Sequence, residues 1–322
     1  MDFTIKAEHD KKTVGEFLKS NTDLSRNSLI MLKNKSDGIT VNGKRVTVRF
    51  ILSESDILSV NYEDADKVNE ADSFVAENAD LLPLLDVIYE DAYIIAVNKP
   101  PFMPSHPSIN HYSDTLANMV VAYFRKNNIS SFYRSVNRLD KNTSGVVLVA
   151  KNKIISARLN NMMQNGGIRK TYIAVISGDV NDIYPKNLDE IGGFFEYDKN
   201  KKNGRIIAPI KRECESIIKR VCAADGDYAE TGFEITKSNR LASVVKVYPK
   251  TGRTHQIRLH FHAVGCPLLG EDLYCENKPG TLQIGRHALH AYSLEFAHPE
   301  SGKKITLKCE PPDDMRSIMD RI

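Results

Sequence analysis

The chain has 322 residues and a mass of 36.2 kDa, with 41% hydrophobic and 26% charged residues. This balance is typical of a globular protein of about two domains and excludes a chain that is disordered throughout. No apolar run approaches the ~20 residues that span a bilayer, and the first residues lack the basic and then apolar pattern of a secretory signal. We therefore expect a cytoplasmic protein without a membrane span.

Residues 1–62 are predicted to form a small α+β domain. Residues 13–16 have the form of a capping box at the start of a short helix, and Ser25 is placed to cap a second helix. Two β-prone runs within 39–46 are separated by Asn-Gly, a strong hairpin signal because both turn residues tolerate positive φ. A further strand is predicted over 56–60. The basic side chains either gather on one surface or form an ordinary solvated face; they are Arg26, Lys33, Lys35, Lys44 and Arg45.

Charge is distributed unevenly along the chain, whose net charge is +3. Residues 63–84 contain Lys67 against seven acidic residues, lack hydrophobic periodicity and read as a linker. Residues 85–322 carry most of the basic excess. A basic domain fits a polyanionic partner, although such an excess also occurs in proteins that bind no nucleic acid.

The larger region from residue 85 onward is rich in strand signals. A hairpin is predicted from strands at 87–89 and 93–97, and a helix capped by Ser113 or Asp114 follows. A buried strand over 146–150 precedes a helix that Gly166-Gly167 ends, and an alternating strand follows at 170–176. Residues 178–245 give no clear assignment. Because strands outnumber helices without β-α alternation, we predict an α+β fold with a mixed, mainly antiparallel sheet and flanking helices.

Five cysteines are scattered along the chain without a C-x-x-C pair. An odd number argues against a disulfide framework, and the lack of close pairs argues against a structural zinc site. The sequence predicts reduced thiols, several of them buried, at Cys214, Cys222, Cys266, Cys275 and Cys309.

A dense polar segment over 137–145 precedes the predicted buried strand. A loop that is fixed by a rigid strand is well placed to carry function. Asp140 lies between Arg138 and Lys141, and these cations favour its carboxylate form. The alternative is an Asx-turn in which these polar side chains only satisfy the turn backbone.

A helix is predicted after Thr254, its candidate cap, and ends near Gly265. Ile257, Phe261 and Val264 would share its buried face, with His255, Arg258 and His262 on the opposite face. A metal site formed by His255, His260 and His262 is disfavoured, because His260 lies roughly 140° around the helix from His255. On the strand at 170–176, Tyr172 taken alone is an aromatic residue at the edge of the core. Phosphate-loop, dinucleotide and nucleophile-elbow motifs are absent from the sequence.

Together these segments resemble the RluA family of RNA pseudouridine synthases. The resemblance rests on Asn98-Lys99-Pro100 with His106-Pro107, Arg138-Leu139-Asp140 with Thr143-Ser144-Gly145, Lys170-Thr171-Tyr172, the run from Thr251 to Arg258, and the run from Arg286 to Ala291. They occur in the order found in the family and span 85–300. Residues 1–62 resemble the small S4-like RNA-binding domain that often precedes this catalytic domain.

The resemblance implies an enzyme that isomerises uridine in RNA by breaking the N1–C1′ bond, rotating the uracil and rejoining it through C5, without metal or organic cofactor. Asp140 would be the catalytic carboxylate, which either attacks C1′ or removes the C2′ proton. Tyr172 would stack on the base and help to remove the C5 proton, and Arg258 would hold Asp140 ionised. Arg138 would enter the RNA stack beside the extruded nucleotide.

The implied chemistry fits these residue types. A base inside a helix must be flipped out, which costs a few kcal/mol, and an aromatic side chain can stack on the flipped base. A carboxylate can act as a nucleophile at a glycosidic carbon, and in a closed pocket it needs a cation to remain charged.

The resemblance also implies that the partner is RNA, and it leaves the kind of RNA open. By it, Arg26, Lys33, Lys44 and Arg45 bind RNA. We expect a monomer acting on ribosomal RNA of the large subunit, with transfer RNA as the alternative. A non-catalytic RNA-binding or ribosome-assembly protein and a metal hydrolase are the rival classes. Three positions depart from the family pattern: Asn137 stands where the family usually has His, and Pro101-Phe102 replaces the common Ala-Gly.

Overall fold

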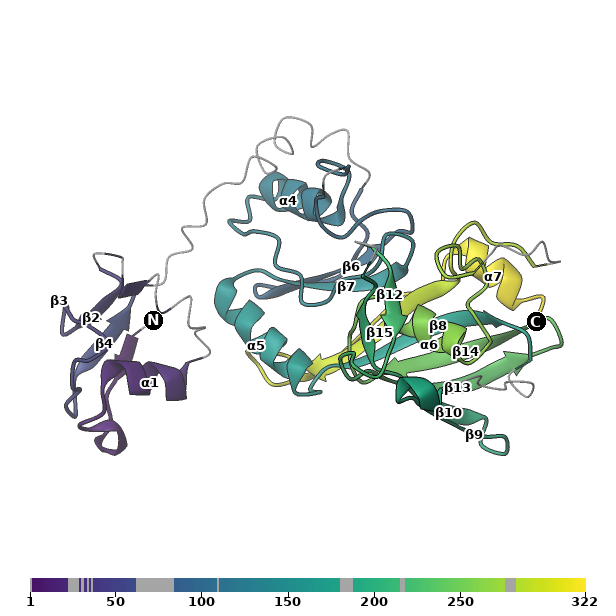
Figure 1. The fold of residues 1–322 in the computed structure, drawn as a ribbon. Helices are drawn as coiled ribbons and strands as arrows, with labels where there is room; N and C mark the ends of the chain where they lie inside the picture. Colours follow the sequence, from purple (N-terminus) through teal and green to yellow (C-terminus); the bar gives the residue numbers. More distant parts are fainter. Residues whose placement is uncertain are drawn as a thin grey trace.

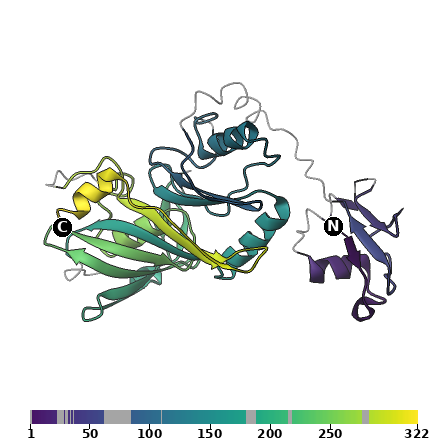
Figure 2. The same cartoon turned by 180° about the vertical axis from the view of Figure 1, so that it is seen from behind.

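The computed structural model describes residues 2–22, 29, 32–33, 35, 37–61, 84–108, 110–179, 188–214, 218–275 and 282–322. Within these ranges the chain forms a four-stranded sheet, a ten-stranded sheet and a two-stranded sheet, together with a few short helices (Figures 1 and 2). The predicted α+β class is therefore confirmed. Among the described helices, none is long and apolar enough to cross a membrane.

The four-stranded sheet is built from residues 2–60 and is antiparallel throughout. Its order is β1 (Asp2–Thr4), β4 (Ile57–Val60), β2 (Ile39–Val41), β3 (Lys44–Arg45), with η1 (Ala7–His9) and α1 (Val14–Asn21) beside it. The predicted capping box is present: the backbone N–H of Glu16 donates to Thr13 Oγ1, and the backbone N–H of Thr13 donates to Glu16 Oε2. The predicted hairpin turn has positive φ at Asn42 and Gly43. Strand β1 was not predicted, and the helix expected after Ser25 lies largely outside the described residues.

The ten-stranded sheet carries the remaining long strands. Its order is β5 (Val87–Glu90), β6 (Ile94–Lys99), β7 (Ser144–Ala150), β15 (Leu289–Ala297), β8 (Arg169–Ser177), β14 (Ala242–Pro249), β13 (Glu230–Ser238), β10 (Asn203–Ile207), β9 (Phe194–Asp198), with β16 (Lys304–Lys308) paired to β15. All neighbours are antiparallel except β7 and β15. The hairpin of β11 (Ile210–Arg212) and β12 (Arg220–Cys222) is separate from it.

Helices cover both faces of this sheet, as the alternation of its strands requires. At β7, Val146 and Leu148 pack with α5 (Lys153–Gln164), while Val147 and Val149 pack with α4 (Leu116–Lys126) on the other face. At β8, alternate residues likewise face α6 (Gln256–Ala263) or α7 (Asp313–Met319). A short η4 (Asp189–Ile191) precedes β9. The region 178–245, which the sequence left unassigned, therefore supplies one edge of the sheet and the small hairpin.

Two predicted helix caps were wrong. Helix α4 is capped by Thr115 and not by Ser113 or Asp114; the Asp114 carboxylate lies 2.7 Å from His111 Nδ1. Helix α6 follows His255, which has a left-handed backbone and no side-chain cap bond. The hydroxyl of the predicted cap Thr254 instead accepts a hydrogen bond from Arg138.

None of the five cysteines forms a disulfide bond, so all are thiols, as predicted, but they are less buried than expected. Cys266 is buried, Cys214 is exposed, and the other three are partly buried. Burial raises the pKa of Cys222 to about 11, so this thiol stays protonated at neutral pH.

Candidate active site

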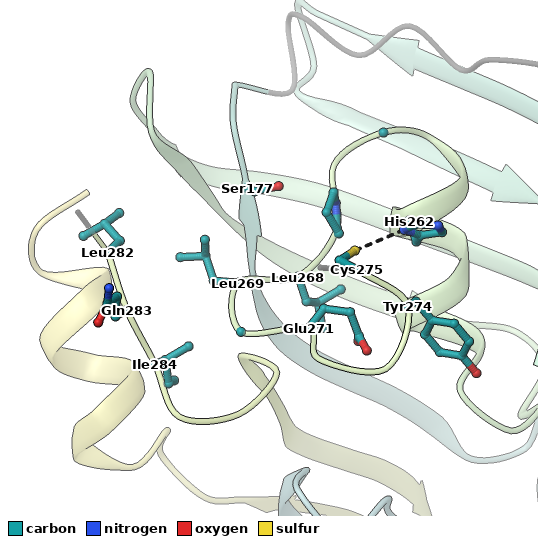
Figure 3. A pocket seen from close by; sticks show the side chains of 13 residues that line it. Ser177, His262, Leu268, Leu269, Glu271, Tyr274, Cys275, Leu282, Gln283 and Ile284 are labelled. Atoms are coloured by element: carbon teal, nitrogen blue, oxygen red, sulfur yellow. Dashed lines mark hydrogen bonds between the residues drawn. The ribbon is translucent and has the colours of Figure 1, made fainter. Parts of the chain in front are cut away.

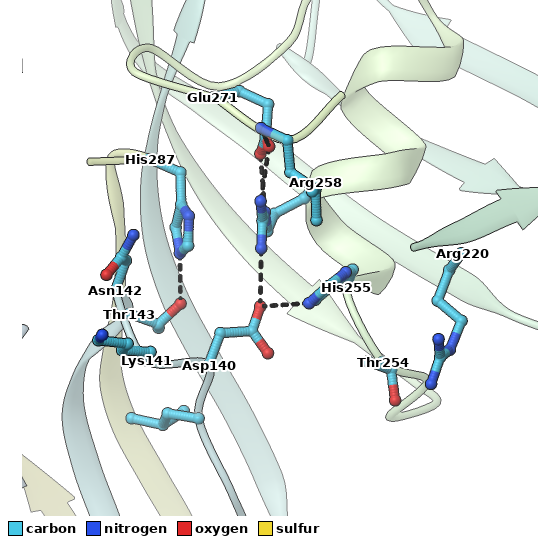
Figure 4. A network of polar contacts seen from close by, with 12 residues as sticks. Asp140, Lys141, Asn142, Thr143, Arg220, Thr254, His255, Arg258, Glu271 and His287 are labelled. Carbon is cyan, nitrogen blue, oxygen red and sulfur yellow. Dashed lines mark hydrogen bonds and ion pairs between the residues drawn. The ribbon is translucent and has the colours of Figure 1, made fainter. Parts of the chain in front are cut away.

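Asp140 lies on the loop that enters β7, in a group of charged side chains drawn from three segments (Figure 4). Its Oδ2 atom is 3.4 Å from Arg258 Nη1 and 3.8 Å from His255 Nε2. The Asp140 side chain is 28% exposed, whereas that of Arg258 is 6% exposed. The carboxylate is therefore open to solvent on one side and faces cationic or hydrogen-bonding groups on the other.

Arg258 is held from behind by Glu271, a residue that the sequence analysis did not single out. Its Nε and Nη2 atoms donate to the two carboxylate oxygens of Glu271 at 2.7 and 2.6 Å. The Arg258 guanidinium also lies 5.4 Å from the ring centre of Tyr274. Burial opposes its charge, but the Glu271 hydrogen bonds and the two carboxylates outweigh burial and raise the pKa of Arg258. The bidentate pair fixes the plane of the guanidinium, which presents its third nitrogen to Asp140.

His255 contacts both Asp140 and Tyr274. Its Nδ1 atom is 2.6 Å from the Tyr274 hydroxyl, which accepts a hydrogen bond from the backbone N–H of Arg220. The Tyr274 proton is then free to point at Nδ1, which assigns the imidazole proton to Nε2, facing Asp140. Burial, partly opposed by Asp140, lowers the pKa of His255, which favours this neutral form. The left-handed backbone at His255 brings its ring to the site.

Tyr172, on β8, lines one cavity together with Asp140 and Arg258. Burial, reinforced by the nearby charge of Asp140, raises the pKa of Tyr172, so the phenol stays protonated at neutral pH. Lys170, on the same strand face, donates to the backbone oxygen of Thr251. The structure thus brings together the three residues predicted from separate motifs.

Two exposed cations flank Asp140 on its own loop. Arg138 is exposed and donates to Thr254 Oγ1 at 3.1 Å, and it lines the cavity that contains Tyr172. Lys141 is exposed, and its Nζ atom is 3.1 Å from His111 Nε2. A second cavity of about 270 Å³, on the Lys141 side, is also lined by Asp140, His255 and Arg258. The Asp140 side chain therefore lines both cavities.

The segment 286–291 fixes the loop that carries Asp140. Arg286 is fully buried; it donates to the backbone oxygen of Asn142 at 3.0 Å and, through two nitrogens, to Asp314 at 2.7 and 3.0 Å. Asp314 lies in the first turn of α7. The C-terminal helix is thereby joined to the loop through one buried guanidinium.

Two histidines of the same segment contact the next loop residues. His287 Nε2 lies 2.8 Å from Thr143 Oγ1, and His290 Nδ1 lies 2.9 Å from Ser144 Oγ. Burial lowers the pKa of His290 to about 4 and that of His287 to about 2, so both stay neutral. At Gly145, φ is +121°, and an added Cβ would lie 2.3 Å from the backbone oxygen of Ala291. The loop is therefore pinned at consecutive residues by β15 and the segment before it.

The Lys-Pro segment holds the loop from its other side. The ammonium of Lys99, which is fully buried, donates to the backbone oxygens of Pro100, Met103 and Lys141. Burial lowers the pKa of Lys99 to about 7, although Asp140 opposes the shift. The side-chain amide of Asn137 binds the backbone of β7 as a neighbouring strand would. Its Nδ2 donates to the backbone oxygen of Val146, and its Oδ1 accepts from the backbone N–H of Leu148. The residue that departs from the family pattern thus supports the loop by hydrogen bonding.

The three histidines of the disfavoured metal site point to different partners. His255 faces Asp140, His260 Nε2 lies 3.0 Å from the backbone oxygen of Ala208, and His262 Nδ1 lies 3.2 Å from Cys275 Sγ. His255, Arg258 and His262 nevertheless all lie against the ring of Tyr274, so they share one side of this helix, as the helix pattern predicted. In the described part of the chain, no cluster of three or more metal-ligating side chains is found.

Glu271 also lines a cavity of about 930 Å³ (Figure 3). It is lined by His262, Tyr274 and Cys275 on one side and by residues 282–284 on the other. Asp140 and Tyr172 are not among its lining residues. We therefore locate the chemistry by the charged groups around Asp140 rather than by cavity size.

The predicted N-terminal basic residues belong to a different sheet from Asp140. Lys44 and Arg45 are exposed on β3, and Arg45 donates to the backbone oxygen of Lys33 at 3.3 Å. Lys33 is also exposed. These three residues are thus close to one another, whereas Arg26 lies outside the described residues.

A carboxylate that a buried arginine orients beside a tyrosine, where the chain enters the interior strand β7, is the arrangement of an enzyme that acts at a glycosidic carbon. A model of the family described as RNA pseudouridylate synthase matches residues 93–263, more than half of the chain. The chain therefore belongs to this family, and the expected pseudouridine synthase activity is confirmed at the level of the family.

Relatives of similar length support this membership. The chain is 33% identical over 297 residues to the "Uncharacterized RNA pseudouridine synthase YjbO" of Bacillus subtilis (strain 168), covering 92% of this chain and 94% of the relative. It is 26% identical to the "Ribosomal large subunit pseudouridine synthase C" of Buchnera aphidicola subsp. Acyrthosiphon pisum, covering 99% and 96%. The solved structure of "Human RNA Pseudouridylate Synthase Domain Containing 1" has the same fold, with a TM-score of 0.54 at 22% identity over 71% of this chain and 84% of that one.

Proposed function

We propose that this protein converts specific uridines of large-subunit ribosomal RNA to pseudouridine, with Asp140 as the essential carboxylate. The observation that carries the proposal is the chain of contacts Glu271–Arg258–Asp140 beside Tyr172. An aspartate that only satisfies a turn does not require a buried arginine beside it whose orientation is fixed by a second carboxylate. The ribosomal substrate is supported by relatives named ribosomal large subunit pseudouridine synthases C and D.

In the proposed reaction, the uridine leaves the RNA stack and its uracil enters the cavity beside Tyr172. Exposed Arg138 is placed to fill the gap and offset part of the unstacking cost. The Asp140 carboxylate then either attacks C1′ or removes the C2′ proton, and the N1–C1′ bond breaks. The uracil turns and C5 bonds to C1′; in the first route this breaks the Asp140–C1′ bond, and in the second the abstracted proton returns to C2′. The C5 proton then leaves and N1 gains a proton, so that the product is an isomer of the substrate.

The roles of the neighbours follow from their charges. Arg258 would stabilise the ionised form of Asp140 and fix its orientation. We propose that the reaction uses no cofactor or metal. Tyr172 would stack on the uracil. Because the phenol of Tyr172 keeps its proton at neutral pH, it can accept the C5 proton only if its own proton leaves at the same time. We therefore assign stacking as the main role of Tyr172.

We also propose a division of labour along the chain. Residues 1–62 would form an S4-like RNA-binding domain, joined by the acidic linker 63–84 to a catalytic domain over 85–322. Lys33, Lys44 and Arg45, with Arg26, would neutralise RNA phosphates and supply affinity without chemistry. The protein would work as a cytoplasmic monomer.

The substrate is tested by mapping pseudouridines in RNA from cells with and without this gene. Loss of one or more sites in large-subunit ribosomal RNA, restored by the wild-type gene, is the expected result. Loss of pseudouridine sites only in transfer RNA would show that transfer RNA is the substrate instead. An unchanged map in all RNA would favour a non-catalytic RNA-binding role.

A further inference from the structure

Phe102 combines two features that do not help the fold. Its backbone has a φ of +65°, a left-handed conformation that is costly for a bulky side chain and natural for glycine. Its side chain is 55% exposed, so burial of the ring does not compensate for the strained backbone. A strained, exposed aromatic residue is an observation that calls for a functional explanation.

The loop that carries Phe102 is tied to the loop that carries Asp140. The Lys99 ammonium binds the backbone oxygens of both Met103 and Lys141, at 2.7 and 3.1 Å. On the other side, Ser105 Oγ donates to the backbone oxygen of Leu139 at 2.7 Å. Phe102 therefore belongs to the rim of the active site.

The rim around Phe102 has the composition of a surface for unpaired RNA. Lys141 and Arg138 are exposed there, and a second exposed aromatic residue, Tyr112, follows His111, which contacts Lys141. Proteins that bind single-stranded RNA combine cations with exposed rings on which bases stack. Phe102 lines neither of the cavities that contain Asp140, so its partner is not the flipped uracil.

We propose that the ring of Phe102 stacks on an unpaired base next to the target uridine and so contributes to selecting the RNA. The inference rests on the proposed function, because it requires RNA at the Asp140 site. Phe102 would act in binding, outside the chemical step.

The test compares full-length Phe102→Gly, Phe102→Leu and Phe102→Trp with the wild type on an in vitro transcript of large-subunit ribosomal RNA. Glycine should weaken binding about 10-fold, the loss expected for one stacked base, and leucine should weaken it nearly as much. Tryptophan should bind within about twofold of the wild type. The slope of affinity against salt should not change, because no phosphate contact is lost.

Stability separates this role from a structural one. Phe102→Gly should keep or raise the unfolding temperature, because glycine accepts the positive φ. The rate of pseudouridine formation at saturating enzyme should also stay unchanged. Phe194→Ala is the matched control: Phe194 is also an exposed ring, 45% exposed, but lies on the edge strand β9, and its loss should not affect binding.

If the wild type makes pseudouridine, the inference is overturned by unchanged RNA affinity in Phe102→Gly or by equal RNA affinity of Phe102→Leu and the wild type. A wild-type protein that makes no pseudouridine in any RNA would instead overturn the proposed function.

Discussion

Asp314→Asn should reveal whether the C-terminal helix positions the loop of Asp140. The substitution keeps the shape of the side chain but removes the negative partner of the buried Arg286 guanidinium. Removal of one partner from a buried ion pair costs about 3–5 kcal/mol. Because the Asp314 side chain is 37% exposed, solvent screening reduces this to about 2 kcal/mol. In a protein of 322 residues, this loss lowers the unfolding temperature by about 3 °C.

The effect on stability should depend on pH. Burial alone would raise the pKa of Asp314, but its hydrogen bonds and attraction to Arg286 outweigh burial and lower it. A depressed pKa stabilises the fold above the unfolded pKa of about 3.9, and this contribution disappears as pH falls through the folded pKa. The gap in unfolding free energy between wild type and Asp314→Asn should be full at pH 7 and should shrink below about pH 4.

Catalysis should change with the loop. Arg286 also holds the backbone oxygen of Asn142, so its displacement should misplace Asp140 by a fraction of an ångström and lower kcat about 10-fold with little change in KM. Single-turnover pseudouridine formation and thermal unfolding measure the two effects. The control is Asp313→Asn, in the same helical turn, whose carboxylate pairs with exposed Arg316. Equal stability and equal kcat of the two variants would refute the coupling.

Three further variants test separate parts of the proposed function and fold. Gly145→Ala should cost about 3 kcal/mol or more in urea unfolding, because its Cβ would meet the backbone oxygen of Ala291; a loss under about 0.5 kcal/mol would contradict the close approach. Arg258→Lys keeps the charge but loses the planar fork, so kcat should fall about 100-fold while RNA affinity persists; wild-type kcat would argue against its orienting role. Lys44→Gln with Arg45→Gln should reduce the salt slope of RNA binding by about 1–2 without changing the rate at saturating enzyme, whereas an unchanged slope would remove these residues from the interface.

Local features were the most predictable from the sequence. The capping box at Thr13 and the Asn42-Gly43 turn depend on neighbouring residues alone, and both formed as expected. The alternation of β8 correctly separated its two faces, because strand periodicity is also local.

Partners that depend on the tertiary fold were not predictable. Glu271 and Asp314 look like ordinary surface carboxylates until the fold brings each of them to a buried arginine. The central place of β15 between β7 and β8 joins segments far apart in the chain. At His255, an ordinary helix-start pattern gave no sign of the left-handed backbone that the structure has there.

The most direct test of the central claim is single-turnover formation of pseudouridine by Asp140→Asn, with wild-type protein assayed in parallel on the same labelled RNA. Asparagine keeps the size of the side chain and can still satisfy a turn, but it cannot act as a carboxylate nucleophile or base. Product formation should be abolished, while RNA affinity and unfolding temperature should stay close to those of the wild type. Wild-type turnover by Asp140→Asn would contradict the assignment of this carboxylate as the catalytic centre.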